Sequence, residues 1–188
     1  MATTVDSEDR ALIGTLKHAA SALGAAGIPF ALAGKFAVHA RGGPLSEHDV
    51  DFLIREADAD QALRALTSEG FEPVHPPEDW LVKAYEDDRL VDLIFRPVNR
   101  PVTDETLART DELSVYGVRI PVLAATELMV HTVSTFTETH CDYGRALPTA
   151  RSLREQIDWA RVAAETADSP YARAFLGLLA DLDIIEGT

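Results

Sequence analysis

Apolar and polar positions repeat with two different periods along this chain of 188 residues. Up to about residue 122, short apolar runs alternate with segments whose apolar residues recur at helical spacing. Beyond that point only helical spacing occurs, and three helices are predicted over 124–140, 149–167 and 169–182. We therefore predict an α/β core over residues 1–122 and a C-terminal helical subdomain over residues 123–188.

Individual elements of the first part follow from its period and its breaking residues. Helices are predicted over 7–27, 35–43, 57–71 and 102–113. Strands are predicted over 28–34 and 49–55, as a pair within 80–97 joined by the polar turn "EDDR", and as a hairpin over 114–122. This alternation indicates an α/β (α+β) fold.

Composition limits the class of protein. Apolar residues make up 46% and charged residues 26%, as in a soluble globular protein. The net charge of −14 argues against broad binding to nucleic acid backbones, which needs a basic surface. Cys141 is the single cysteine, and no apolar run approaches the roughly 20 residues that span a bilayer. We expect a cytoplasmic protein without a membrane partner.

Two aspartates interrupt the apolar strand predicted over 49–55. Asp49 and Asp51 are two positions apart, so their side chains project from the same face of that strand. Aspartates near a strand start are often simply solvated, but buried neighbouring carboxylates repel each other and need compensation. A divalent cation is the simplest compensation, because carboxylate oxygens suit Mg²⁺ or Mn²⁺.

A third carboxylate, Asp92, stands alone among apolar residues in "RLVDLIFRP". It could pair with Arg89 or Arg96. If its strand lies beside the strand of Asp49 and Asp51, three carboxylates converge. Such a group can bind one or two metal ions with a nucleoside triphosphate (NTP), and Asp92 is then the candidate general base.

The combined pattern resembles a known superfamily. "FALAGKFAVHARGGPLSEHDVDFLI" together with "RLVDLIF" is similar to the nucleotidyltransferases of the polymerase-β-like fold, whose signature is an apolar strand, G-[GS], a helix, D-x-[DE] and a later carboxylate. The resemblance implies a mixed twisted sheet flanked by helices, with a helical part closing over the nucleotide. It extends to bacterial minimal nucleotidyltransferases, including relatives of abortive-infection toxins and antibiotic nucleotidyltransferases. By the same comparison Arg154, Glu155 and Asp158 occupy the places of their "R-D-x-x-D" helix.

Two positions depart from the superfamily pattern. Gly34-Lys35 stands where Gly-Gly or Gly-Ser is usual, and Lys35 either contacts phosphate or faces solvent. The helix that carries a nucleotide-binding lysine in relatives has His131 instead, either as a partial substitute or as an ordinary packed residue. The chain has only three lysines: Lys17, Lys35 and Lys83.

Some further residues are ambiguous. Residues 139–148 read as an irregular connection from which Arg145 could reach the nucleotide or the acceptor. Trp80 and Tyr85 suit a core better than an acceptor site. His48 is expected to point away from the metal pair. His39 lies on the helix predicted over 35–43, and its role there is ambiguous.

We predict a metal-dependent nucleotidyltransferase that moves a nucleoside monophosphate from an NTP onto an acceptor hydroxyl. Asp49, Asp51 and Asp92 would bind Mg²⁺ or Mn²⁺, and Gly34, Lys35, His131, Glu155 and Asp158 would bind the nucleotide. The acceptor is a small molecule, a protein side chain or an RNA end, and the net charge favours a cationic small molecule. The alternative is a catalytically degenerate module that binds a nucleotide or a partner, such as a toxin paired with a cognate antitoxin.

Overall fold

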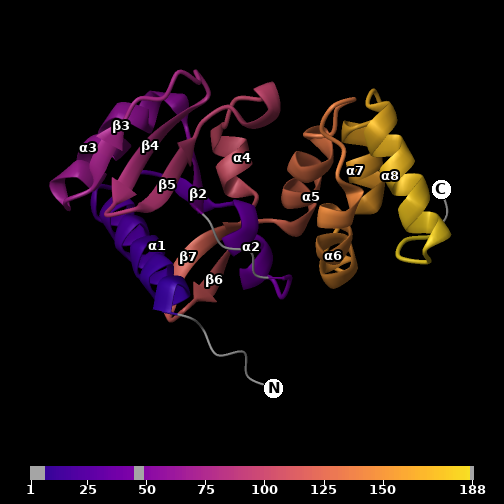
Figure 1. Ribbon diagram of the computed structural model, residues 1–188, viewed down its shortest axis with the longest axis horizontal. Coiled ribbons are helices and arrows are strands. Elements are labelled where there is room, and N and C mark those ends of the chain that lie inside the picture. Colours follow the sequence, from indigo (N-terminus) through magenta and orange to yellow (C-terminus); the bar gives the residue numbers. More distant parts are fainter. Residues whose placement is uncertain (1–6, 45–48, 187–188) are drawn as a thin grey trace.

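A computed structural model describes residues 7–44 and 49–186. Within these residues, seven strands form one sheet in the order β3-β4-β5-β2-β1-β7-β6 (Figure 1). The strands are β1 (Phe30–Leu32), β2 (Asp49–Ile54), β3 (Glu72–Val74), β4 (Leu81–Glu86), β5 (Arg89–Ile94), β6 (Thr110–Val115) and β7 (Val118–Leu123). β2 pairs with β5 and β1 with β7 in parallel, and the other pairs are antiparallel. The predicted α/β fold with a mixed sheet is confirmed.

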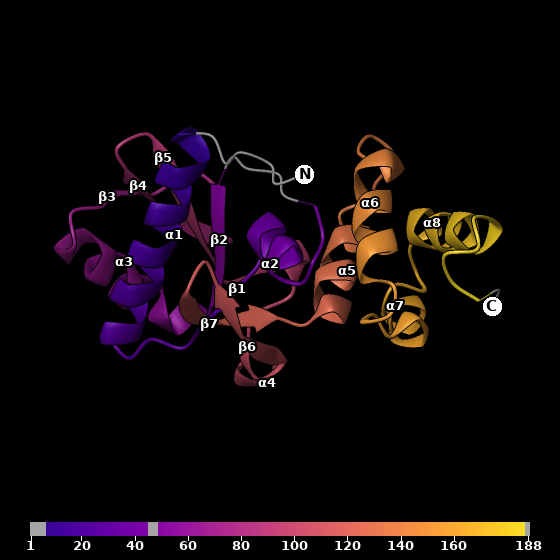
Figure 2. The same ribbon diagram turned by 90° about the horizontal axis from the view of Figure 1, so that it is seen from below.

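Helices cover both faces of this sheet. They are α1 (Ser7–Ala25), α2 (Gly34–Ala40), α3 (Ala59–Ser68), α4 (Asp104–Ala108), α5 (Ala125–Ser134), α6 (Tyr143–Leu153), α7 (Trp159–Glu165) and α8 (Pro170–Asp181), with short 3-10 turns η1 (Glu56–Asp58) and η2 (Pro97–Asn99). Figure 2 shows α1 and α3 against one face and α2 on the other, with α5–α8 stacked beyond α2. No helix among the described residues is long and apolar enough to cross a lipid bilayer.

The strand period decides which side chains face α1 and α3. On β2, Val50 and Phe52 are fully buried, and on β5, Val91 and Leu93 are fully buried. Because side chains alternate along a strand, the residues between them project from the opposite face. The aspartates of both strands therefore lie on the face that carries α2 and the helical part.

The helical part contains four helices among the described residues, so the prediction of three is wrong. The additional helix is α6, residues 143–153, which spans the end of the predicted irregular connection and the start of the helix predicted after it. It begins where the Asp142 side chain accepts a hydrogen bond from the backbone N–H of Arg145. The single helix predicted over 149–167 is interrupted after Leu153. There Asp158 donates its N–H to Thr126 Oγ1 on α5 and caps α7, so a tertiary contact overrides the local helical pattern.

Two smaller differences involve exposed strands. β3 is not predicted, because its three residues are all exposed and carry no apolar alternation. Residues 110–113, predicted as helix, pair with β7 instead. In both places backbone pairing with a neighbouring strand decides the structure, and this pairing cannot be predicted from the side-chain pattern of the segment.

Ion pairs connect the helical part to the α/β core. Glu127 on α5 is buried and accepts hydrogen bonds from Arg109, between α4 and β6, and from Arg161 on α7. Arg100, just after η2, pairs with Glu165 on α7 at 3.1 Å. Charged contacts as well as apolar packing therefore join the helical part to the α/β core.

Candidate active site

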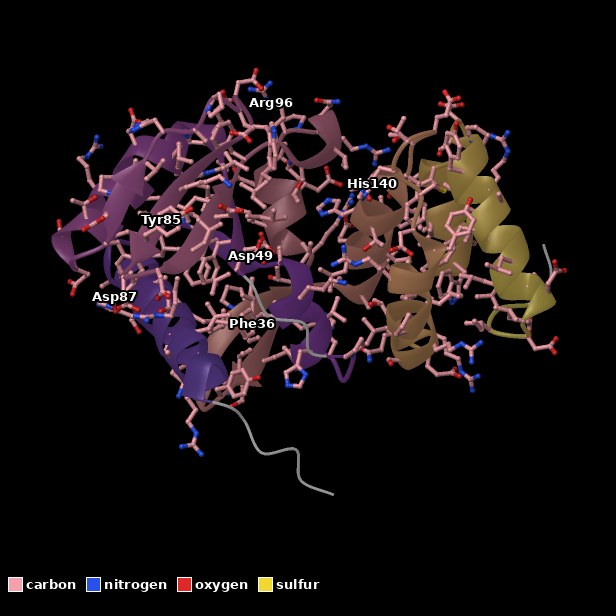
Figure 3. All side chains as sticks on the ribbon, in the orientation of Figure 1. Phe36, Asp49, Tyr85, Asp87, Arg96 and His140 are labelled. Atoms are coloured by element: carbon pink, nitrogen blue, oxygen red, sulfur yellow. The ribbon has the colours of Figure 1, made fainter. Side chains whose placement is uncertain are left out.

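Three aspartates meet on adjacent parallel strands. The register of β2 and β5 places Asp51 beside Asp92 and Asp49 beside Leu90. One carboxylate oxygen from each of Asp49, Asp51 and Asp92 lies within 4.8 Å of the other two. Figure 3 labels Asp49 near the middle of the molecule. It also labels Arg96, on the α/β core, and His140, on the helical part. The convergence expected from the sequence is present.

The turn after β1 approaches this cluster closely. The backbone N–H of Ala33 donates to the carbonyl of Asp51 at 2.9 Å, and Gly34 follows with φ +58°. A Cβ on Gly34 would lie 1.8 Å from Asp51 Oδ2, far inside van der Waals contact. Only glycine combines this backbone conformation with room for the carboxylate.

Burial and mutual repulsion disfavour the charged state of the cluster. The pKa of Asp51 is raised to about 7 by its enclosed position and by the nearby carboxylates of Asp49 and Asp92. Burial also raises the pKa of Asp92, against the opposing effect of Lys83. Lys83 lies opposite Asp92 on β4, with Nζ 3.5 Å from Asp92 Oδ1.

The pairing of Asp92 differs from both partners considered in the sequence. Arg89 donates to Thr15 and Asp87, and Arg96 donates to Asp79. Asp92 Oδ1 is buried, and no hydrogen-bond partner for it occurs among the described residues. A buried carboxylate oxygen of this kind, beside two more carboxylates, fits a hard divalent cation such as Mg²⁺ or Mn²⁺.

Two cavities meet at the aspartates. The larger holds about 580 Å³ and the smaller about 340 Å³. Six residues line both: Gly34, Lys35, Asp51, His131, Thr132 and Arg145. Asp49 lines the smaller cavity only, and Asp92 lines neither. Asp92 is buried, and its carboxylate faces Lys83 on β4.

Positive charge faces the aspartates across these cavities. Within the described ranges, the side chains of Lys35 and Arg145 make no ion pair or hydrogen bond. Burial lowers the pKa of His131 and so disfavours its charged form. Two uncompensated cations beside three carboxylates form a site of mixed charge, which suits a polyphosphate bound together with a metal ion.

Comparison with protein families identifies the chain. A family model described as uncharacterised nucleotidyltransferase matches residues 46–184, which is most of the chain and includes Asp49, Asp51 and Asp92. The chain belongs to this nucleotidyltransferase family. A search of curated proteins found no significant match.

Solved structures share the fold of this chain. ANT(2″)-Ia in complex with adenylyl-2″-tobramycin matches with a TM-score of 0.61 and 13% identity, over 90% of this chain and 99% of that chain. A protein from H. pylori proposed to be a nucleotidyltransferase matches with a TM-score of 0.56 and 14% identity, over 95% and 83%. A protein from Thermotoga maritima, also proposed to be a nucleotidyltransferase, matches with a TM-score of 0.52 and 18% identity. This match covers 78% of this chain and 92% of that chain. At these identities the likeness concerns the fold alone.

Some residues proposed from the sequence lie away from the two cavities. Glu155 is exposed and pairs with Arg154 at 2.8 Å, and Asp158 caps α7. Neither lines either of the two cavities, so we leave both out of the proposed nucleotide site. His39 stacks on Tyr116, and His48 lies outside the described residues.

The aromatic residues separate into two cases. Trp80 is 37% exposed and lines the larger cavity, so its assignment to the core is wrong. Tyr85 is half-buried on β4 and lines neither cavity. Sequence alone does not separate them, because both are single aromatic residues in or beside the same predicted strand.

Further cavity residues escaped the sequence analysis. Arg96, considered from the sequence only as a partner of Asp92, lines the larger cavity together with η2 and His140. One signal exists only in the backbone: Val98 and Asn99 have φ of +45° and +61°. Left-handed conformations in non-glycine residues cost about 1–3 kcal/mol each and concentrate at functional sites.

Proposed function

We propose that the protein transfers a nucleoside monophosphate from an NTP to an acceptor hydroxyl. The observation that carries this proposal is the cluster of Asp49, Asp51 and Asp92 beside Gly34, whose missing side chain leaves room for the Asp51 carboxylate. Membership of a nucleotidyltransferase family supports the reaction class. The metal, the nucleotide and the acceptor are part of the proposal.

Each residue has a distinct part in this reaction. Asp49, Asp51 and Asp92 would hold Mg²⁺ or Mn²⁺, which when bound neutralises charge on the phosphate oxygens. Lys35 and Arg145 bind the polyphosphate, since they face the cavities without a partner among the described residues. Lys83 lies beside Asp92 and lowers its pKa, against the effect of burial.

Asp92 is the proposed general base. It accepts the proton of the acceptor hydroxyl while that oxygen forms a bond to the α-phosphorus, and the bond from this phosphorus to the bridging oxygen breaks to release pyrophosphate.

A second candidate is a catalytically degenerate nucleotide-binding module. One observation favours it: α5 carries no lysine, and His131, which lines both cavities, has its pKa lowered by burial, which disfavours the charged form. Lys35 and Arg145 count against it, because they supply positive charge to the same cavities.

Label transfer separates the two candidates. The protein is incubated with Mg²⁺ and each α-³²P-labelled NTP, and with a panel of aminoglycosides, lincosamides, cell-extract small molecules, proteins and RNA. We expect label on one class of acceptor, and loss of that label by at least a hundredfold in Asp92→Asn. Metal-dependent binding of NTP without transfer to any class would contradict the enzyme and favour the binding module.

A further inference from the structure

The two cavities differ in chemistry on either side of their shared wall. The transferred α-phosphate must lie near the aspartates, and it carries pyrophosphate on one side and a nucleoside on the other. Apart from the shared wall, the smaller cavity adds the polar residues Asp49 and Thr149, with Val38 and Leu128. The larger adds an apolar surface that includes Leu53, Trp80, Ile94, Val98 and Phe136. A flat base suits the apolar and aromatic part of the larger cavity, whereas pyrophosphate suits the shared wall, which carries Lys35 and Arg145.

A strained turn forms part of the larger cavity. η2 (Pro97–Asn99) lines this cavity and not the smaller one, and its last two residues are both left-handed. Valine is a poor choice for that conformation, because its branched side chain crowds the backbone. The strain therefore needs support from the surrounding structure.

Both ends of the turn are anchored. Before it, Arg96 donates from Nη2 to the backbone carbonyl of Asp79 at 2.7 Å. After it, Arg100 donates from Nη2 to the backbone carbonyl of Glu165 on α7 at 2.9 Å. These bonds attach the turn to the β3–β4 connection on one side and to the helical part on the other, so the wall is fixed in place before a ligand enters.

Asn99 gives this wall hydrogen-bonding capacity. It is the only asparagine of the chain, and its side chain makes no hydrogen bond to any residue that the structure describes. A carboxamide offers two donor hydrogens and an acceptor oxygen, which match the polar edges of nucleobases. Asparagine also tolerates left-handed backbone well, so a purely structural role must be tested separately.

We infer that the larger cavity holds the nucleoside of the triphosphate and that Asn99 determines which base is accepted. This inference rests on the proposed function and adds the element that selects the nucleotide. Asn99 acts by hydrogen bonding to the edge of the base, while the apolar walls contact its faces.

Calorimetric titration tests the inference with all four NTPs and with inorganic tripolyphosphate, in the presence of Mg²⁺. The protein is compared with Asn99→Gly, which keeps the left-handed backbone and removes the carboxamide, and with Asn99→Asp, which replaces its donor by an oxygen. Asp183→Gly is the matched control, because Asp183 has φ +52° and lies outside both cavities.

We expect the unmodified protein to prefer one NTP. Asn99→Gly should reduce the affinity ratio between the best and the worst NTP by about tenfold, the effect of a lost base-edge contact, with unchanged tripolyphosphate affinity. Asn99→Asp should change the order of preference, and Asp183→Gly should change nothing.

Unaltered preference in Asn99→Gly would overturn the inference and leave the proposed function intact. Equal affinity of the unmodified protein for all four NTPs would do the same. Failure of the unmodified protein to bind any NTP or tripolyphosphate would instead contradict the proposed function itself.

Discussion

Gly34 and Asp51 approach each other so closely that the turn after β1 and the carboxylate cluster form one unit. Replacing Gly34 with alanine places a methyl group within 1.8 Å of Asp51 Oδ2 and disfavours a left-handed backbone. We expect Gly34→Ala to lose at least tenfold in Mn²⁺ affinity and in NTP affinity, measured by calorimetry.

Gly24→Ala provides the control for this change. Gly24 lies within α1, and an added Cβ would have no atom within 4 Å. Gly24 is in the last turn of the helix, so alanine there should change the stability by no more than about 1 kcal/mol and leave ligand affinity unaltered. Equal ligand affinities in Gly34→Ala and Gly24→Ala would show that Gly34 has no part in the site.

Asp51 makes the stability of the metal-free protein depend on pH. Its pKa of about 7 in the folded chain lies above the ordinary value of 3.8, so the folded state binds a proton that the unfolded state has released. Its contribution to stability is therefore present at low pH and decreases as the pH rises from about 4 to about 7. Asp51→Asn should remove this loss and make the metal-free protein more stable at pH 8, by on the order of 3 kcal/mol.

Urea unfolding at several pH values, in the presence of a chelator, measures this effect. Asp183→Asn is the control, because Asp183 is exposed at the end of α8 and lies outside both cavities. Parallel stability curves for Asp51→Asn and the unmodified protein would contradict the assigned repulsion. Adding Mg²⁺ at pH 8 should stabilise the unmodified protein and leave Asp51→Asn almost unaffected.

At the scale of elements, α5 is fixed by a buried carboxylate. The Glu127 side chain is 5% exposed, and two arginines from different elements donate to it. Glu127→Ala would leave Arg109 and Arg161 without this partner, although both reach solvent in part. We expect a loss of about 2–3 kcal/mol in the free energy of unfolding, somewhat less than for a fully buried pair.

Glu112→Ala on the exposed face of β6 is the corresponding control, with an expected change within about 0.5 kcal/mol. Urea unfolding compares the two variants. Equal stability of the two would mean that Glu127 does not hold α5 against the α/β core.

Sequence period predicted the elements that have an apolar side. β2, β5 and α3 were predicted because buried positions such as Phe52, Leu93 and Leu66 recur at the strand or helix period. The same period predicted that the side chains of Asp49 and Asp51 project from one face of their strand, where Asp92 of the neighbouring strand joins them. β3 and the break between α6 and α7 were not predicted, since they depend on backbone pairing and on the contact between Asp158 and Thr126.

For the candidate site, the sequence pattern proposed the three aspartates together with Gly34, Lys35 and His131, and it did not propose the contacts around them. The contact between Lys83 and Asp92 depends on the register of β4 against β5, which a single sequence does not fix. The place of Arg145 depends on the packing of the helical part, and the turn at Val98 and Asn99 on backbone angles. These features arise from tertiary structure and have no local pattern.

At the scale of the whole molecule, the cavities lie between the α/β core and the helical part. Lys35 comes from the first and Arg145 from the second, so closing the two parts over a ligand would bring both charges onto it. The division of the chain into an α/β core and a helical subdomain at residue 122 stays a prediction. The shared cavity implies that neither part alone forms the complete nucleotide site.

The most direct test of the account is calorimetric titration of NTP with and without Mg²⁺, for the unmodified protein and for Asp49→Asn. The account predicts that Mg²⁺ strengthens binding of the preferred NTP to the unmodified protein by at least tenfold, and that this gain disappears in a folded Asp49→Asn variant. Equal affinity with and without Mg²⁺ in the unmodified protein, or a full gain retained in Asp49→Asn, would contradict the claim that the aspartates form a metal-dependent nucleotide site.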